Sequence, residues 1–257
     1  RQAQQEGTRY GTATVVASSA DTGFDRIPVL STGSCSPDAA YLHLTSNNTV
    51  YGTRWHTFPT DCAPPIVIDA TSDILSRRWD YSRFGITYAG FQKNLGPASL
   101  ALVVIRDDLL GYALPETPLL LNYEVYANSQ SLHNTPNTFA IYVMALILQW
   151  IQQQGGLDAV EALNKTKADL LYRELDSSDF YLPTAHPDHR SITNITFRLR
   201  DESRTTEFVE HSGARGLLAL GGHRTVGGVR ASIYNGMPLA GVRALIEFMR
   251  EFERSGA

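Results

Sequence analysis

Few cysteines, no long apolar run and little net charge limit what this chain of 257 residues can be. Its two cysteines, Cys35 and Cys62, show no C-x-x-C spacing, which argues against a disulfide framework and against a zinc site, so we expect no bound metal. The longest apolar segment, 139–151, is shorter than the roughly 18 to 20 residues of a membrane span. It is typical of a buried helix, and we expect no membrane partner.

The charge and composition are those of an ordinary globular protein. A formal net charge of -4 gives no general attraction to nucleic acid. With 43% hydrophobic and 19% charged residues, the chain is long enough for one large domain or two moderate ones. We expect a cytoplasmic protein. The sequence begins without methionine at Arg1, and residues 1–6 resemble the end of a helix, so we expect a piece of a longer protein.

Two kinds of pattern follow one another along the chain. Short, β-branched or apolar runs predict strands, and those without alternation favour a parallel sheet buried on both faces. These runs are 11–18, 40–45, 66–68, 84–89 and 100–105. Apolar residues at helical spacing then predict helices. The predicted helices are 122–128, 139–153 (capped by Thr138) and 157–175. The remaining pattern is α+β, with strands at 195–199 and 229–233 and helices at 206–212 and 239–252. The Gly155-Gly156 pair predicts a boundary between domains 1–154 and 155–257.

Lys93 is the first candidate for chemistry. It follows an apolar run that ends at Ala89 and precedes a turn at Gly96-Pro97, after which another apolar strand begins. Partial burial would lower the pKa of its amine and make it a nucleophile, as a Schiff-base lysine requires. The alternative is a surface lysine at the tip of a loop.

Asp69 and Thr49 also stand at the ends of predicted strands. Ligand-binding residues of parallel sheets gather at the carboxyl edge, so these two side chains are expected near Lys93. A buried carboxylate needs a cationic partner, and the protonated ring nitrogen of pyridoxal phosphate is one. The alternative for Asp69 is to cap a helix that starts near Thr71.

Three cationic residues suggest a substrate that carries anionic groups. Arg230 lies in an otherwise apolar strand, and a buried guanidinium binds a carboxylate in a bidentate manner. His223 and Arg224 form a cationic pair on a glycine-flanked turn. Without further information, this pair is more typical of a solvated turn.

Four separated segments together resemble phosphoserine aminotransferases, a family of pyridoxal-phosphate enzymes of fold-type I. The resemblance covers essentially the whole chain and implies an α/β fold, with a mainly parallel large domain and a smaller α+β domain. It also implies a further N-terminal portion that has no counterpart here. The four segments are 69–77, 88–97, 133–136 and 222–235.

The resemblance assigns a role to each candidate residue. Lys93 matches the lysine that binds the cofactor covalently, and Asp69 matches the partner of the ring nitrogen. Thr49 matches a hydroxyl near the phenolic oxygen, and Gln92 a ligand of the cofactor phosphate. Asn134 and Thr135 match residues that reach this phosphate from the neighbouring subunit, which implies a homodimer with shared active sites. His223 and Arg224 match residues that bind the substrate phosphate, and Arg230 matches the residue that binds the α-carboxylate.

The implied reaction transfers an amino group between phosphoserine and 2-oxoglutarate, giving 3-phosphohydroxypyruvate and glutamate. The family also accepts a phosphorylated hydroxythreonine in pyridoxine biosynthesis. Two alternatives stay open. One is another pyridoxal-phosphate aminotransferase or lyase, and the other is an inactive fragment that keeps the fold.

Overall fold

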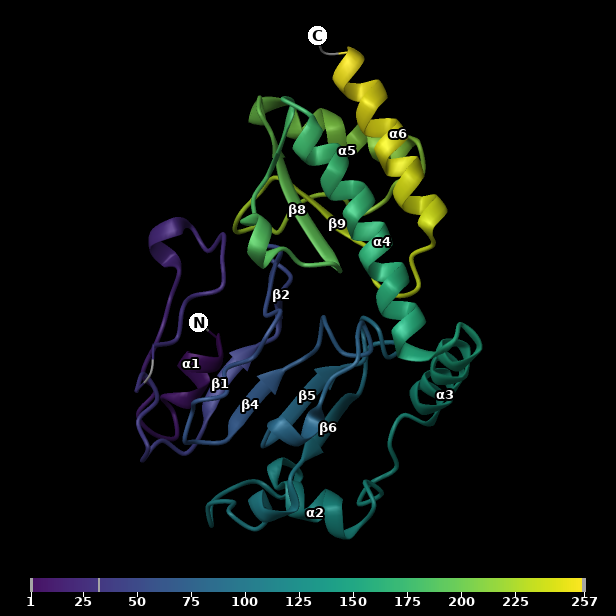
Figure 1. Cartoon of the computed structure of the whole chain (residues 1–257). Coiled ribbons are helices and arrows are strands. Elements are labelled where there is room, and N and C mark those ends of the chain that lie inside the picture. Colours follow the sequence, from purple (N-terminus) through teal and green to yellow (C-terminus); the bar gives the residue numbers. More distant parts are fainter. Residues whose placement is uncertain (1, 32, 256–257) are drawn as a thin grey trace.

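The computed structural model describes residues 2–31 and 33–255, and its framework is two separate sheets (Figure 1). The first sheet has the order β1-β4-β5-β6, in which β1, β4 and β5 are parallel and β6 is an antiparallel edge strand. This confirms the predicted α/β fold with a mainly parallel sheet. The strands are β1 (Leu42–Thr45), β4 (Ile66–Asp69), β5 (Ile86–Gly90) and β6 (Ala101–Ile105).

The second sheet has three antiparallel strands in the order β7-β8-β9. A two-stranded ribbon, β2-β3, lies between the two sheets (Figure 1). The sequence did not predict β2, β3 or β7, because strands of two or three residues are too short to show a period. These strands are β2 (Asn47–Asn48), β3 (Thr53–Arg54), β7 (Tyr181–Pro183), β8 (Asn194–Leu199) and β9 (Val229–Ser232).

The helices agree closely with the predicted ranges. The α-helices are α1 (Gln2–Gly7), α2 (Tyr123–Asn128), α3 (Thr138–Gln153), α4 (Gly156–Ser177), α5 (Thr205–Ala214) and α6 (Leu239–Ser255). Short 3-10 turns span Ala20–Thr22, Tyr81–Arg83, Asp107–Leu109, Leu119–Leu121, Pro187–His189 and Glu202–Arg204. The predicted N-terminal helix corresponds to α1, and Arg1 lies outside the described residues.

Three local predictions are wrong. Residues 11–18 form no strand, because their β-branched side chains find no partner strand and most stay exposed. The helix α3 is capped by Asn137, whose side chain accepts a hydrogen bond from the Ala140 N–H, and not by Thr138. Finally, α3 is not a buried helix, because only one stripe of it contacts the core.

The exposed side of α3 is strongly apolar. Phe139 is 66% exposed and Tyr142 61%, whereas Ala140 and Ile151 are buried. A helix that is apolar all round normally has something packed on each side. The sequence of α3 has no polar face and therefore predicted a buried helix. Which side of the helix is buried depends on the elements that pack against it.

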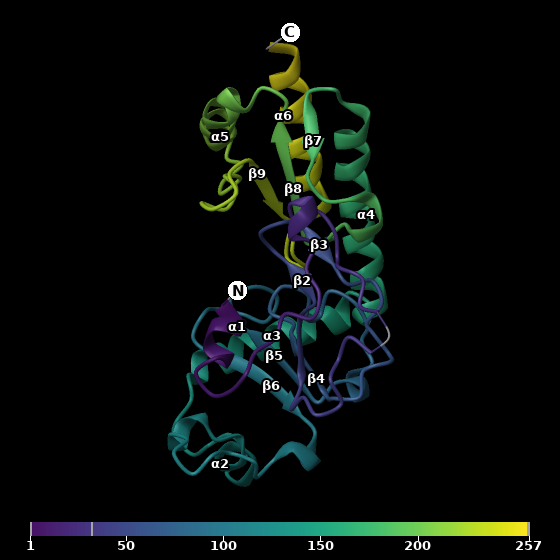
Figure 2. The same cartoon turned by 90° about the vertical axis from the view of Figure 1, so that its left-hand side faces the viewer.

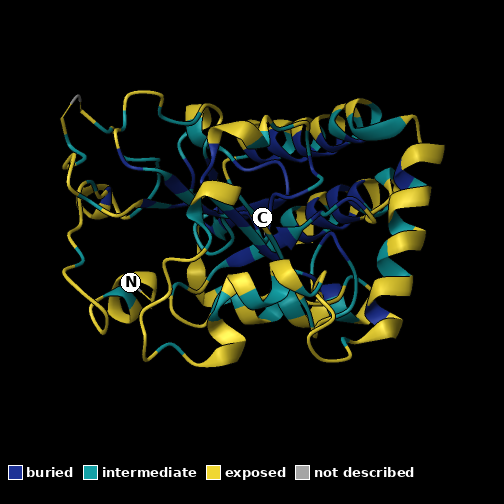
Figure 3. Cartoon of the chain, turned by 90° about the horizontal axis from the view of Figure 1, so that it is seen from below, coloured by how far each residue is buried: buried dark blue, intermediate teal, exposed yellow. Residues whose placement is uncertain are grey.

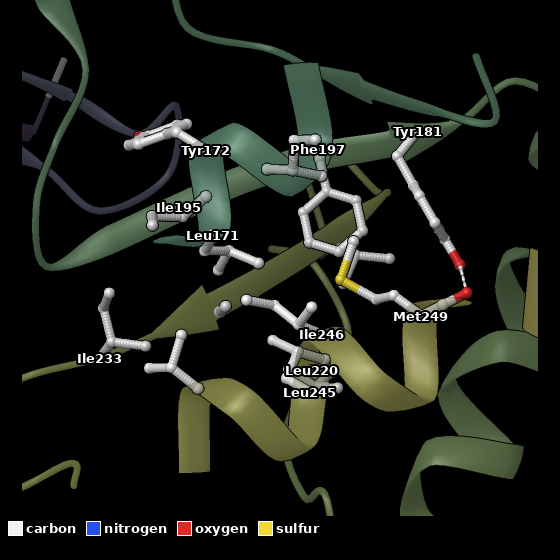
Figure 4. Close-up of a cluster of buried hydrophobic side chains, with 14 of the residues drawn as sticks. Leu171, Tyr172, Tyr181, Ile195, Phe197, Leu220, Ile233, Leu245, Ile246 and Met249 are labelled. Carbon is white, nitrogen blue, oxygen red and sulfur yellow. Dashed lines mark hydrogen bonds between the residues drawn. The ribbon is translucent and has the colours of Figure 1, made fainter. Parts of the chain in front are cut away.

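The largest hydrophobic core lies between the second sheet and its helices (Figure 4). The helices α4 and α6 run side by side along this sheet (Figures 1 and 2), and α5 packs against α6 through Phe208, which contacts Phe248 and Phe252. Phe197, Phe208 and Tyr181 pack edge to face at its centre, and the Tyr181 hydroxyl donates a hydrogen bond to the Met249 carbonyl at 2.8 Å. Each such aromatic side chain removes about 150–250 Å² from water, which anchors the sheet rigidly.

Two smaller cores support the first sheet. One underlies the turn after β5 and includes Phe91, Leu95 and Ala140. The other lies against β1 and β4. Figure 3 shows the buried residues concentrated at the centre and the exposed ones on outer helix faces and loops. Among the described residues, no helix is both long and apolar enough to cross a membrane.

Candidate active site

Lys93 is held by a tight turn directly after β5. Phe91 and Leu95 are buried on either side of it, and the Gly96 N–H closes the turn by donating to the Phe91 carbonyl at 2.8 Å. Gly96 adopts a φ of 155°, which glycine tolerates better than residues with a side chain. The local sequence therefore fixes the backbone of the lysine on two apolar anchors.

The amine of Lys93 is half-buried and has one described hydrogen bond. Its Nζ donates to the Thr49 Oγ1 at 2.8 Å, which joins the turn after β5 to the loop after β2. Burial lowers the pKa of Lys93, with Asp69 acting in the opposite direction and Arg230 adding to the decrease. The structure thus places Lys93 against Thr49 and within range of the charges of Asp69 and Arg230.

Asp69 is the last residue of β4, at the carboxyl edge of the parallel strands. Its Oδ1 accepts a hydrogen bond from the Thr71 N–H at 2.9 Å. No helix starts there, because residues 71–77 form turns, so the helix-capping alternative is replaced by a cap of this turn. Its register partners are Thr45 on β1 and Tyr88 on β5.

Arg230 lies on β9 of the second sheet and faces the site from the other side. Its Nε is buried and has no hydrogen-bond partner among the described residues. Leaving a buried guanidinium nitrogen unpaired costs about 1–3 kcal/mol or more. An anion supplied by a substrate would satisfy it, which agrees with the predicted carboxylate site.

His223 shares a cavity of about 350 Å³ with Arg230. Its loop is closed by the Val226 and Gly227 N–H groups, which both donate to the His223 carbonyl. Arg224, next to it, is exposed. The cationic pair therefore lies beside the Arg230 strand, with Arg224 directed to solvent.

The side chains of Gln92, Asn134 and Thr135 do not contact the Lys93 amine. Gln92 is exposed, and its side chain folds back over Gly90. Asn134 and Thr135 are exposed in the loop before α3, which is fastened at Asn137 by a hydrogen bond to the Ser99 Oγ. No described contact links any of the three to Lys93.

Sequence reasoning missed two residues beside Asp69, namely His43 and Tyr88. Their side chains meet across the sheet, with His43 Nε2 and the Tyr88 hydroxyl 3.0 Å apart. Burial lowers the pKa of His43 and raises that of Tyr88, and the charge of Asp69 raises both. The alternation of β1 and β5 places both on the face of the sheet that Asp69 occupies, a signal available only once the strand register is known.

This donor set fits one cofactor, pyridoxal phosphate. A primary amine of lowered pKa suits its aldehyde, a carboxylate at a strand end suits its protonated ring nitrogen, and the Thr49 hydroxyl suits its phenolic oxygen. The Arg230 Nε, buried and without a hydrogen-bond partner among the described residues, adds a cationic group to this set. The fold and the site together define the class of pyridoxal-phosphate-dependent aminotransferases.

Comparison with known proteins agrees with this class and narrows it. Residues 4–245 match the family described as aminotransferase class-V. A phosphoserine aminotransferase of Desulfosudis oleivorans is 50% identical over 245 residues, which cover 95% of this chain and 67% of that protein. One from Geobacillus kaustophilus is 47% identical and is covered to 70% of its length. The chain belongs to the phosphoserine aminotransferase family.

Solved structures show the same relationship. A phosphoserine aminotransferase from Bacillus circulans subsp. alkalophilus superposes with a TM-score of 0.96 at 42% identity, covering 100% of this chain and 71% of that one. A pyridoxal-phosphate-bound phosphoserine aminotransferase from Trichomonas vaginalis gives a TM-score of 0.91 at 35% identity, with 97% and 72% covered. The predicted family and fold are confirmed.

Proposed function

We propose that this chain, with pyridoxal phosphate, transfers an amino group between O-phospho-L-serine and 2-oxoglutarate, giving 3-phosphohydroxypyruvate and L-glutamate. The observation that carries this proposal is the half-buried amine of Lys93, hydrogen-bonded to Thr49 and flanked by Asp69 and Arg230. The family membership described above supports it. The same chemistry extends to 4-phosphohydroxy-L-threonine, which also carries a phosphate and an amino acid group.

When bound, the cofactor supplies an aldehyde for amine exchange and an electron sink for the carbanion at the substrate Cα. With the cofactor bound, Lys93 Nζ would carry the proton between the substrate Cα and the cofactor carbon, and its lowered pKa keeps a neutral amine accessible for this role. Asp69 holds positive charge on the ring nitrogen. The Thr49 Oγ1 accepts a hydrogen bond from the Lys93 amine and fixes the direction of that amine.

The substrate's anionic groups set the second half of the site. The Arg230 guanidinium binds the α-carboxylate, which satisfies its unpaired Nε. His223 and Arg224 bind the substrate phosphate. Gln92, Asn134 and Thr135 bind the cofactor phosphate, the last two from the neighbouring subunit.

Two tests address the chemistry. Glutamate formation from phosphoserine and 2-oxoglutarate is expected from wild-type protein, and Lys93→Ala should abolish both this activity and the lysine–cofactor adduct trapped by borohydride. Lys165→Ala is the matched control, since Lys165 is exposed on α4 and, among the described residues, pairs with Glu161 alone. No adduct in the wild-type protein would favour the inactive-fragment alternative.

A third test addresses the substrate. Arg224→Ala should raise the Michaelis constant for phosphoserine at least tenfold, because a charge-assisted hydrogen bond contributes about 1.5–3 kcal/mol. It should leave the constant for glutamate within twofold. Equal losses on both substrates would favour another aminotransferase of the same fold.

We further propose two domains, a homodimer and a cytoplasmic location. The domain boundary lies at 154/155, where Gly155 adopts a φ of 98° and the chain turns from α3 into α4. The exposed apolar face of α3 and the exposed Asn134-Thr135 loop support a second copy of the chain as their partner. Sedimentation should give twice the monomer mass, and Tyr142→Asp should shift it toward the monomer.

A further inference from the structure

Residues from the second sheet meet Lys93 where β9 ends. Two consecutive residues after the strand, Tyr234 and Asn235, face two consecutive residues of the turn, Lys93 and Asn94. The Asn235 N–H donates to the Asn94 Oδ1 at 3.1 Å, and the Lys93 Nζ lies 6.0 Å from the centre of the Tyr234 ring. The reactive turn of the first sheet is therefore fastened to the second sheet residue by residue.

The side chain of Asn235 completes this seam. Its Nδ2 donates to the Leu75 carbonyl at 2.8 Å, and its Oδ1 accepts from the Asn164 Nδ2 at the same distance. Asn164 in turn donates to the Ser76 carbonyl. Both described hydrogen bonds of the Asn235 side chain hold neighbouring segments in place. Tyr234 is therefore the residue of this pair that reaches the site.

A buried lysine holds the backbone at this point. Lys167 on α4 is fully buried, and its Nζ donates to the carbonyls of Ile233, Tyr234 and Met237 at 2.9–3.1 Å. An ammonium group with three carbonyl acceptors fixes the turn that carries Tyr234. The position of the tyrosine is thus set by α4 and not by loop geometry alone.

The hydroxyl of Tyr234 is hydrogen-bonded to Asn194 and lies on the same side of the site as Thr49. The Asn194 Nδ2 donates to it at 3.0 Å, and Asn194 also accepts from the Asn47 Nδ2 at 2.9 Å. Burial raises the pKa of Tyr234, while Asn194 and Thr49 act on its hydroxyl and lower it. Because the Thr49 oxygen accepts from Lys93, its own proton is free for the tyrosine oxygen.

We propose that Tyr234 is a positioning residue for Lys93, acting through Thr49 and held in place by Lys167 and Asn235. The Tyr234 oxygen accepts a hydrogen bond from the Thr49 hydroxyl, so the Thr49 oxygen accepts in turn from the lysine and the amine points in one direction. The role rests on the proposed function of Lys93. It gives the second sheet a direct part in holding the reactive amine.

The test compares Tyr234→Phe with Tyr181→Phe. Both changes remove one hydrogen-bonded hydroxyl, and the Tyr181 hydroxyl bonds to the Met249 carbonyl in the core of the second sheet. In the protein freed of cofactor, the pH dependence of Lys93 acylation is followed by peptide mass spectrometry. In the cofactor-loaded protein, the turnover number and the Michaelis constant for phosphoserine are measured.

In Tyr234→Phe the Thr49 proton becomes free to bond to the neutral amine. One hydrogen bond corresponds to about a fivefold change in the protonation equilibrium, so the acylation midpoint should fall by about 0.7 pH unit. The turnover number should fall about five- to tenfold with the Michaelis constant within twofold, since the amine and not the substrate loses its orientation. Tyr181→Phe should change neither quantity.

A second variant keeps the test decisive if Tyr234→Phe does not fold. Thr49→Val, at a half-exposed position, removes the link from the other end and should also lower the midpoint. If both variants fold, the double variant should have the same acylation midpoint as Thr49→Val alone, because the effects of two residues in one hydrogen-bond network do not add. An unchanged midpoint in Thr49→Val, full additivity, or equal behaviour of Tyr234→Phe and Tyr181→Phe would overturn the proposal.

These outcomes separate the two proposals. If wild-type protein is active but Tyr234→Phe matches Tyr181→Phe, the positioning role is wrong and the proposed function stands. If wild-type protein neither binds the cofactor nor turns over, the proposed function fails. The acylation midpoints, measured without cofactor, then still decide whether Tyr234 acts on Lys93.

Discussion

Replacing Lys167 by methionine should destabilise the protein strongly. The residue is buried and has no carboxylate partner among its described contacts. The change keeps the length of the side chain but removes the donor of three hydrogen bonds, to Ile233, Tyr234 and Met237. Each carbonyl is then left without this donor at a buried position. The turn after β9 should loosen as a result.

The magnitude follows from two opposing effects. Hydrogen bonds to a charged group contribute about 1.5–3 kcal/mol each, so three of them sum to roughly 5–9 kcal/mol. Against this stands the desolvation of a buried ammonium, several kcal/mol, which also lowers the pKa of Lys167 to about 8. The expected net loss in the free energy of unfolding is about 2–4 kcal/mol.

The assay is thermal and urea unfolding of Lys167→Met beside Lys165→Met. Lys165 lies two residues away on α4, is exposed and forms only an i,i+4 pair with Glu161, so its loss should stay within about 0.5 kcal/mol. For a protein of this size, the expected loss for Lys167→Met corresponds to a decrease in melting temperature of roughly 5–15 °C. Equal melting temperatures for the two variants would refute the assignment of a clamp to Lys167.

Three further predictions concern pH, the anion-binding loop and the site lysine. The pKa of Lys167 is about 8 in the folded protein and 10.5 for a free side chain. Between these pH values the unfolded chain binds more protons than the folded one, so the free energy of unfolding rises with pH. The difference in melting temperature between wild type and Lys167→Met should therefore grow from pH 8 to 10, and a constant difference would contradict this. Gly222→Ala should raise the Michaelis constant for phosphoserine, because a Cβ there would overlap the Gly227 carbonyl, whereas Gly221→Ala meets nothing within 4 Å and should leave it unchanged. Arg230→Lys should lower affinity for both amino acid substrates alike, since a single ammonium replaces a bidentate fork, and a loss confined to phosphoserine would contradict a carboxylate role.

Much of the site could be predicted from sequence because its residues stand next to strong local signals. Lys93 follows an apolar run and precedes a glycine turn, and Asp69 ends a short apolar strand. In a parallel sheet, strand ends share one edge, so two such residues are neighbours whatever the details. Arg230 was found because a cation among apolar strand residues requires an anion.

Other parts of the site had no local signal. His43 and Tyr88 lie on different strands, and only the register of β1, β4 and β5 brings them beside Asp69. Asn194 begins β8 and Tyr234 follows β9, both far from Lys93 in sequence. The exposure of α3 was not predicted. Its apolar side chains indicate that the helix surface packs against something, but not which element or chain packs there.

The sequence by itself determined the class of fold, the helices and the longer strands. These follow from the period of the side chains and from turns that glycine and proline impose locally. The tertiary structure alone decided how the two sheets meet at Lys93, through Asn235, Lys167 and Tyr234. The physical reason is that such hydrogen bonds join residues more than 60 positions apart, where the direction of a side chain depends on packing and not on its neighbours in the chain.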